Sequence, residues 1–379
     1  MLYIALRMLF GDRAKSILLI CALTFATLLM AEQTAIFFGI LRWATAMLRN
    51  SKATIWVVDA KTEQVNETKG LRDIELQRVR SVEGVSWAMP ICFAIIQTKM
   101  SNGFFKNVQL VGLDSSTLAG LPRQIDAGSA EELLLAKTVM IDQVAIEKLS
   151  PDPDDPIGIG SSFEINDKEA RVVAVCHVDR SFFGYPYIYT TYNKAVKYIP
   201  PQRRLLSYII TQPENGVSAK QVADRIEKET GLKAYLEHEF ARATIIWFFK
   251  NTGIPIAMGA TVLLGFIVGI AIAGQTFYSF ILENIPSFCV LKAMGATNRV
   301  IYRMMIIQAT VVGIMGYGFG IGITGLLGRI FIKKEQPPFF LDSSIFIVSF
   351  LAILFICCFS VLVAARKIKE IEPAQVFRA

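Results

Sequence analysis

The chain has 379 residues, of which 53% are hydrophobic and 19% charged, and its mean hydropathy is +0.45. Soluble domains have about 25% charged residues, so this composition excludes an ordinary cytosolic enzyme, and the apolar content excludes a disordered chain. The net charge is +7, and six cysteines are too few for a disulfide scaffold. The sequence therefore predicts an integral membrane protein with a sizeable part in water.

Four stretches are long and apolar enough to cross a membrane as helices, which takes about 20 residues. These predicted spans are residues 16–41, 251–282, 304–328 and 343–365. The segments that flank and join them are residues 1–15, 283–303, 329–342 and 366–379. The first stretch is longer than the apolar part of a secretory signal, about 7–15 residues, which favours a retained span over a cleaved signal.

Lys and Arg residues beside the spans indicate the orientation of the chain, because they are enriched in short cytoplasmic segments. With the N-terminus inside, the three inner segments hold ten basic residues and the outer loop holds three. Residues 42–250 hold 26 basic and 25 acidic residues, so the positive excess lies beside the membrane. We therefore expect cytoplasmic termini, a large extracytoplasmic domain over residues 42–250 and no nucleic-acid partner.

Residues 42–250 alternate between strand-like and helix-like patterns. β-Branched and aromatic residues over 53–59 are typical of a strand, and the apolar spacing over 73–82 and 143–149 is typical of helices. Short apolar runs on either side of Asn166-Asp167 predict a hairpin. The predicted fold is four transmembrane α-helices with a mixed α/β domain, in two or more pieces, between the first and second spans.

No phosphate-binding G-x-x-x-x-G-K-[ST] loop occurs, so we expect the chain not to hydrolyse ATP by itself. The pattern G-x-G-x-x-G occurs at residues 320–325, but it lies inside a span with no preceding strand, which argues against a dinucleotide site. Small residues four positions apart let two helices approach closely in lipid. We therefore predict helix-packing roles for Gly265, Gly269, Gly316, Gly318, Gly320 and Gly322.

Few other side chains indicate chemistry. His177 and His238 form no metal-binding motif, and we expect neither a metal site nor a catalytic site. Cys92 and Cys176 both fall outside the membrane; a disulfide in an oxidising compartment and two free thiols are both compatible with the sequence. Glu32 is the one acidic residue within a span, where a structural role and a role in substrate handling or coupling both remain open.

The segment between the second and third spans, residues 283–296, reads ENIPSFCVLKAMGA. It resembles the inner loop of the MacB/FtsX-type permeases of ABC transporters, in the DevC-like and HrtB-like branch with a separate ATPase, which reads approximately E-R-x-x-E-x-G-x-L-K-A-L-G-A. The matching residues are Glu283, Leu291, Lys292, Ala293, Gly295 and Ala296. Asn284, Ser287 and Cys289 replace the usual Arg, acid and Gly, and Pro286 is unexpected. Weaker resemblances lie at residues 6–18, 81–90, 108–114, 160–175 and 366–378.

The resemblance implies a non-catalytic permease subunit in the inner membrane of a bacterium. Its expected partners are a separate ABC ATPase that binds ATP and Mg²⁺, a second permease copy in a homodimer, and a periplasmic adaptor protein. ATP-driven movement of the spans would then move the outer domains and expel a hydrophobic or amphipathic substrate. The residues expected to couple the chain to the ATPase are Glu283, Phe288, Leu291, Lys292, Ala293, Gly295, Ala296 and Arg299.

Two other functions remain open at this point. An FtsX-like regulatory permease would use the same movement to activate an external cell-wall hydrolase and would transport nothing. A membrane-anchored binding domain would have no ATPase partner at all. The substrate itself cannot be named from the sequence, because no pocket with distinctive chemistry stands out.

Overall fold

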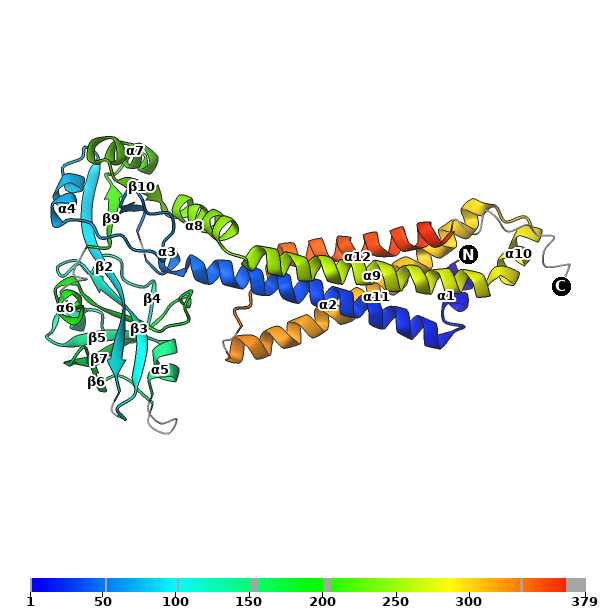
Figure 1. Ribbon diagram of the computed structural model, residues 1–379, viewed down its shortest axis with the longest axis horizontal. Coiled ribbons are helices and arrows are strands. Elements are labelled where there is room, and N and C mark those ends of the chain that lie inside the picture. Colours follow the sequence, from blue (N-terminus) through cyan, green and yellow to red (C-terminus); the bar gives the residue numbers. More distant parts are fainter. Residues whose placement is uncertain are drawn as a thin grey trace. The chain divides into compact units, whose positions relative to one another are not determined.

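The computed structural model describes residues 2–51, 53–100, 102–150, 156–200, 206–334 and 337–365 (Figure 1). The chain divides into two compact units. The membrane unit consists of Met1–Ile40 and Gly253–Ala379, and the outer unit is Leu41–Thr252.

Four helices of the described residues are long and apolar enough to cross a membrane, which confirms the predicted number. They are α2 (Arg13–Ala44), α9 (Ile254–Glu283), α11 (Asn298–Lys334) and α12 (Ser343–Ala364). Two shorter helices, α1 (Leu2–Leu9) and α10 (Ile285–Ala293), complete this part of the chain. α11 begins six residues before the predicted third span, because its first turns carry Arg299 and Arg303, which hydropathy alone leaves outside a span.

The core of the membrane unit is apolar and contains residues from α2, α9, α10, α11 and α12. Leu23, Phe277, Ile301 and Ile353 are each 1% exposed or less. The short helix α1 packs against α11, where the Gln308 side-chain amide donates to the carbonyl of Ala5 at 2.7 Å. This bond gives the buried amide nitrogen a partner, which lowers the cost of a polar group in an apolar core, while the amide oxygen has no partner among the described residues.

The outer unit contains one sheet, with the strand order β10-β1-β9-β2-β3-β8-β5-β7-β4, and β6 pairs with both β2 and β7. The strands are β1 (Ile55–Val58), β2 (Val85–Lys99), β3 (Phe105–Leu113), β4 (Gln124–Gly128), β5 (Thr138–Asp142), β6 (Ser162–Ile165), β7 (Lys168–His177), β8 (Tyr187–Thr191), β9 (Tyr208–Pro213) and β10 (Lys233–Leu236). The helices are α3 (Ala46–Asn50), α4 (Asp73–Arg80), η1 (Glu131–Leu134), α5 (Gln143–Leu149), α6 (Tyr192–Tyr198), α7 (Ala219–Thr230) and α8 (Glu237–Asn251).

The long strand β2 joins the two halves of this sheet. Its first part pairs with β9, and its last part pairs with β3 and β6. Ala88 packs in an apolar cluster with α4 and α7, Ile96 packs in a second cluster with α5 and α6, and Phe93 lies in a third cluster that contains α3 and α8. One strand therefore continues through both halves of the sheet, while each half has an apolar cluster of its own.

The predicted hairpin is confirmed. Asn166 and Asp167 have φ of 47° and 58°, and they connect β6 to β7 as a two-residue turn. Two successive residues with positive φ give the tight turn whose twist matches antiparallel strands, and Asn and Asp tolerate that conformation better than most residues. The predicted helix over residues 143–149 is also confirmed, as α5.

Candidate functional site

The segment between the second and third spans forms the short helix α10. α9 ends at Glu283, where the main-chain N–H and the side-chain amide of Asn284 donate to the carbonyl of Phe280, at 3.1 and 2.9 Å. Pro286 lies in the first turn of α10, where a backbone N–H has no partner within the helix in any case. Asn284 and Pro286, which depart from the family pattern, therefore end one helix and begin the next.

A glycine in the left-handed conformation ends α10. Gly295 has φ of +94°, and its N–H donates to the carbonyl of Lys292 at 2.9 Å. The N–H of Ala296 donates to the carbonyl of Leu291, also at 2.9 Å. These two bonds form a Schellman motif, whose left-handed position suits glycine because a Cβ would be strained there. Four of the residues that carry the family resemblance thus build the C-terminal cap of α10.

α10 has a buried face and an exposed face. Phe288 and Cys289 are 1% and 3% exposed and pack in the apolar core that also contains Ile301. Val290 and Met294, one helical turn apart, are 54% and 71% exposed. Phe288, one of the residues expected to couple the chain to the ATPase, is enclosed by the membrane unit, and its role in coupling stays a prediction. Its position anchors α10 to the spans.

The other predicted coupling residues differ in exposure, and Leu291 packs against the core. Glu283, Ala293, Gly295 and Arg299 are exposed, and Leu291, Lys292 and Ala296 are half-buried. Two exposed apolar side chains near basic residues give a surface that suits a complementary protein groove better than water.

An ion pair joins the N-terminal end of α2 to the C-terminal end of α9. The Lys15 ammonium donates to the Glu283 carboxylate and lies 3.2 Å from the Asp12 carboxylate. The main-chain N–H and the ammonium of Lys15 hold the pKa of Asp12 below its usual value. Figure 1 shows α1 and α10 at the same end of the membrane unit. Sequence reasoning missed this contact because Lys15 and Glu283 are 268 positions apart.

Four of the six predicted packing glycines lie against neighbouring helices. A Cβ on Gly316 would lie 2.6 Å from the Leu23 Cβ, and one on Gly320 would lie 2.5 Å from the Thr27 Cβ. Cβ atoms on Gly265 and Gly269 would lie 3.3 and 3.1 Å from the Cβ atoms of Leu29 and Ala26. Gly318 and Gly322 have no atom within 4 Å of such a Cβ. The first four therefore border the contacts with α2.

We expect Gly320→Leu to destabilise the chain and Gly322→Leu to leave its stability unchanged. At position 320 the new side chain has no room beside Thr27, so α11 and α2 must separate at a cost of about 1–3 kcal/mol. Thermal unfolding of the detergent-solubilised chain measures the difference. Equal melting temperatures for the two variants would show that the close approach of these helices does not contribute to stability.

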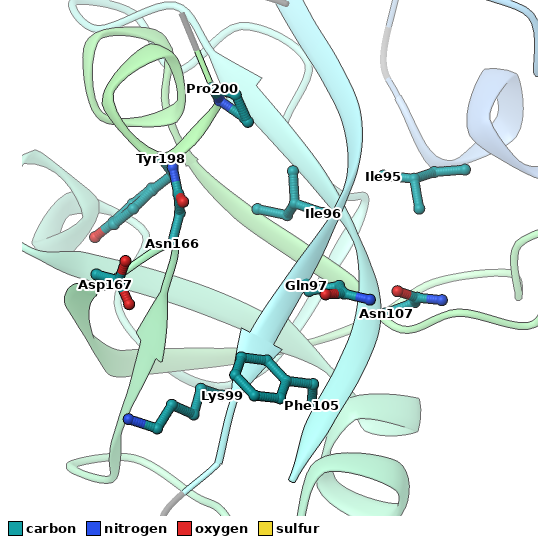
Figure 2. A pocket seen from close by; sticks show the side chains of 10 residues that line it. All are labelled: Ile95, Ile96, Gln97, Lys99, Phe105, Asn107, Asn166, Asp167, Tyr198 and Pro200. Carbon is teal, nitrogen blue, oxygen red and sulfur yellow. The ribbon is translucent and has the colours of Figure 1, made fainter. Parts of the chain in front are cut away.

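The outer unit has a depression of about 590 Å³ beside the β6–β7 turn (Figure 2). It is lined by Ile95, Ile96, Gln97, Lys99, Phe105, Asn107, Asn166, Asp167, Tyr198 and Pro200. In Figure 2, Gln97 and Asn107 lie near each other on neighbouring strands. The polar groups among its described lining residues are amides, one ammonium, one phenol and one carboxylate.

The structure also places the remaining candidate residues. Among the described residues, no group of three or more His, Cys, Asp or Glu side chains could hold a metal ion. Cys92 and Cys176 are free, buried and in different apolar clusters. Burial raises the pKa of Cys92 to about 12, so this thiol is unreactive at neutral pH. Glu32 is half-buried on α2.

Comparison with known proteins places the chain in a family. The MacB-like periplasmic core domain matches residues 16–229, and the FtsX-like permease C-terminal domain matches residues 259–373. Curated proteins give no significant match.

Two solved structures are similar to part of the chain. The extracellular domain of the noncanonic ABC-type transporter YknZ from Gram-positive bacteria is 13% identical, with a TM-score of 0.35, over 48% of this chain and 98% of that one. The periplasmic region of MacB from Actinobacillus actinomycetemcomitans is 13% identical, with a TM-score of 0.36, over 53% of this chain and 94% of that one. The family matches cover more than half of the sequence and both parts of the fold, and the chain belongs to the MacB/FtsX-type family of ABC transporter permeases.

Proposed function

We propose that the chain is the permease subunit of an ABC exporter. It transmits ATP-driven movement from a separate ATPase to its outer unit, which expels a hydrophobic or amphipathic substrate. The observation that supports this best is the construction of α10, which exposes Val290 and Met294 while Phe288 anchors it in the membrane core. A helix held in this way receives a push on one face and passes it on through the other.

The contacts around α10 suggest how the movement spreads. Phe288 and Cys289 pack in the core that α2, α9, α11 and α12 share. A displacement of α10 therefore pushes on all four spans. The Lys15–Glu283 ion pair ties the inner end of α9 to that of α2. Close-packed interiors move as blocks because they compress little, so a small displacement at α10 becomes a movement of whole helices.

The permease proposal also includes the partners of the chain and its location in the cell. ATP and Mg²⁺ bind to the ATPase, and this chain contributes no catalytic group. The termini lie in the cytoplasm, the chain sits in the inner membrane of a bacterium, and a second copy completes a homodimer. A periplasmic adaptor would extend the export path, and a cell-wall hydrolase in its place would give the regulatory function.

Purification of tagged full-length chain from its native membrane in mild detergent, with mass spectrometry of co-eluting proteins, tests this proposal. We expect an ABC ATPase in roughly equal amount, and a loss of about tenfold or more for the double variant Val290→Asp, Met294→Asp, because each buried apolar side chain contributes about 1.5–3 kcal/mol. Tyr3→Asp is the matched control, since Tyr3 is 73% exposed on α1.

The outcomes separate the candidate functions. Recovery of the chain alone at several detergent strengths would overturn the permease proposal and favour an anchored binding domain. An ATPase recovered with a cell-wall hydrolase, and no substrate accumulation on deletion of the chain, would replace export by regulation. If the double variant Val290→Asp, Met294→Asp still binds the ATPase, α10 is not the surface on which the ATPase docks.

A further inference from the structure

One loop of the outer unit contacts the helices at both places where the chain passes between the two units. This junction loop, residues 178–186, connects β7 to β8. The chain passes between the units after Ile40, within α2, and again after Thr252, which follows α8. The contacts of the junction loop with α2, α3 and α8 lie within ten residues of these two points.

The first set of contacts holds the end of α2 and the helix α3. The Asp179 carboxylate accepts from Arg42 at 3.1 Å and from Arg49 at 2.8 Å. The Asn50 amide donates to the main-chain carbonyl of Asp179 at 2.8 Å, and the Asp179 N–H donates to the Asn50 side-chain oxygen, also at 2.8 Å. Arg49 in turn donates to the Thr45 hydroxyl at 2.6 Å. Asp179 of the loop thus contacts both the last turn of α2 and the helix α3.

The second set of contacts holds α8. The rings of Phe182 and Phe248 lie 4.8 Å apart between centroids, and Phe248 is 4% exposed. Phe248 also accepts, through its carbonyl, from the N–H and the hydroxyl of Thr252, the last residue of the outer unit. The contact with the loop therefore lies one helical turn before the chain enters the membrane unit.

A third set of contacts ties the loop to α5, within the part of the sheet that contains β5 and β7. The Lys148 ammonium donates to the carbonyl of Gly184 at 2.5 Å, and the Arg180 guanidinium lies 3.5 Å from the Glu147 carboxylate. The loop consequently has one set of contacts with α2, α3 and α8 and another with α5 beside the sheet.

The stability of the outer unit does not require the charge on Asp179. The side chains of this cluster are 29–41% exposed, and an ion pair in such a setting contributes about 1 kcal/mol or less. Burial opposes ionisation of Asp179, but Arg49 and Arg42 outweigh it and hold its pKa below the usual value. The two bonds between Asn50 and the Asp179 main chain place the loop even without the carboxylate.

We propose that the junction loop is where movement of the spans enters the outer unit, and that Asp179 is the positioning residue that links the loop to the first span. This inference rests on the proposed function, because it assumes that ATP moves the spans. When α2 shifts or rotates, Arg42 and Arg49 carry Asp179 with them, and the loop passes the displacement to α5 and the sheet. Without the carboxylate, α2 moves and the loop stays behind.

Hydrogen–deuterium exchange of the full-length chain with its co-purified ATPase, compared without nucleotide and with ATP trapped by vanadate, tests the proposal. We expect nucleotide to change exchange in both α10 and the junction loop of the natural chain. In Asp179→Asn the change in α10 persists, while the change in the loop falls by about fivefold or more, within the usual range of coupling between sites. ATP turnover stays within about twofold, since no part of the ATPase docking surface has changed.

Glu147→Gln is the matched control, because it removes an ion pair from the same loop on the side of α5 and leaves the contacts with α2 and α3 in place. Arg49→Gln is a second variant that leaves the loop sequence unaltered and should repeat the effect of Asp179→Asn. A loop that responds to nucleotide equally in Asp179→Asn and in the natural chain would overturn the inference, as would a loop that never responds. An α10 that does not respond in the natural chain would instead overturn the proposed function.

Discussion

The double variant Gly295→Pro, Lys292→Glu should lose ATPase-coupled activity while still inserting into the membrane. Gly295 has φ of +94°, whereas proline fixes φ at about −65°. Proline therefore cannot adopt the left-handed conformation that ends α10. The substitution also removes the N–H that donates to the carbonyl of Lys292. A backbone conflict of this kind costs about 3 kcal/mol or more, enough to unfold the last turn of a nine-residue helix.

The change at Lys292 adds an electrostatic effect. It replaces a cation near the exposed face of α10 by an anion, so a groove that accepts the positive helix would repel the variant. We expect ATP turnover stimulated by the permease, and export, to fall by about tenfold or more, since lost charge and shape complementarity at an interface commonly cost several kcal/mol. Reconstituted vesicles with the co-purified ATPase provide the measurement.

Gly216→Pro is the control, because Gly216 also has a positive φ, +87°, but lies between β9 and α7 in the outer unit. It should leave stimulated ATP turnover unchanged. Stimulated ATP turnover of Gly295→Ala should lie between that of Gly216→Pro and that of the double variant. Alanine is strained in this conformation, but it keeps the N–H. Normal ATP turnover and export in the double variant would rule out α10 as the coupling helix.

The second large effect concerns a buried carboxylate of the outer unit. Asp142 is the last residue of β5 and the N-cap of α5, where one oxygen accepts from the N–H of Ala145 at 2.8 Å. The residue is 1% exposed, and its other oxygen has no hydrogen-bond partner. Burial raises the pKa of Asp142 to about 7, although the N–H groups of Tyr187 and Ala145 and the charge of Arg180 oppose the shift.

Because the pKa of Asp142 is higher in the folded chain than in the unfolded chain, the charged carboxylate destabilises the fold. Above pH 7 both the folded and the unfolded chain carry the charge, and the folded chain bears the cost of burying it. As the pH falls from 7 towards 4, the folded chain binds a proton that the unfolded chain does not, so this group's contribution to stability rises. Below about pH 4 both forms are neutral and the contribution is constant.

Asp142→Asn should therefore stabilise the chain at pH 8 and have almost no effect at pH 4.5. The amide oxygen still caps α5, and the buried charge is gone. A shift of about three pKa units corresponds to about 4 kcal/mol at most, which would raise the melting temperature of a unit of this size by roughly 5–15 °C. Thermal unfolding of the detergent-solubilised full chain at pH 8, 6.5 and 4.5 measures the effect.

Asp114→Asn is the matched control with the opposite sign. Hydrogen bonds from Ser116 and Thr117 outweigh burial and hold the pKa of Asp114 below its usual value. Its carboxylate therefore stabilises the fold above the unfolded pKa, and this stabilisation disappears as the pH falls through the folded value. A change at Asp142 that destabilises at pH 8, or that is independent of pH, would contradict the account of a costly buried charge.

Short-range patterns were sufficient for much of the fold. The turn at Asn166-Asp167 follows from two residues that tolerate positive φ between two apolar runs, and the number of spans follows from hydropathy alone. The cap at Gly295 was visible as a motif, but its physical role was not. The sequence showed that glycine stands there, and the structure shows that a left-handed turn requires it.

Contacts between distant residues could not be predicted in this way. Nothing in the sequence pairs Asp179 with Arg49, 130 positions earlier, or Lys15 with Glu283, because opposite charges are common and any of them could have met. The burial of Phe288 could not be predicted for a related reason. An apolar residue in a short inner loop fits an interface and a core equally well, and only the packing against the spans decides between them.

The length of β2 has a consequence for how the protein is made. Residue 91 pairs with residue 208, 117 positions later in the chain, while residues 92–99 find their partner on β3 almost at once. During synthesis one edge of β2 therefore stays unpaired until β9 has crossed the membrane. An exposed strand edge is a template for aggregation, so the newly made outer unit is vulnerable over this interval, and a chain truncated before residue 208 would keep the open edge permanently.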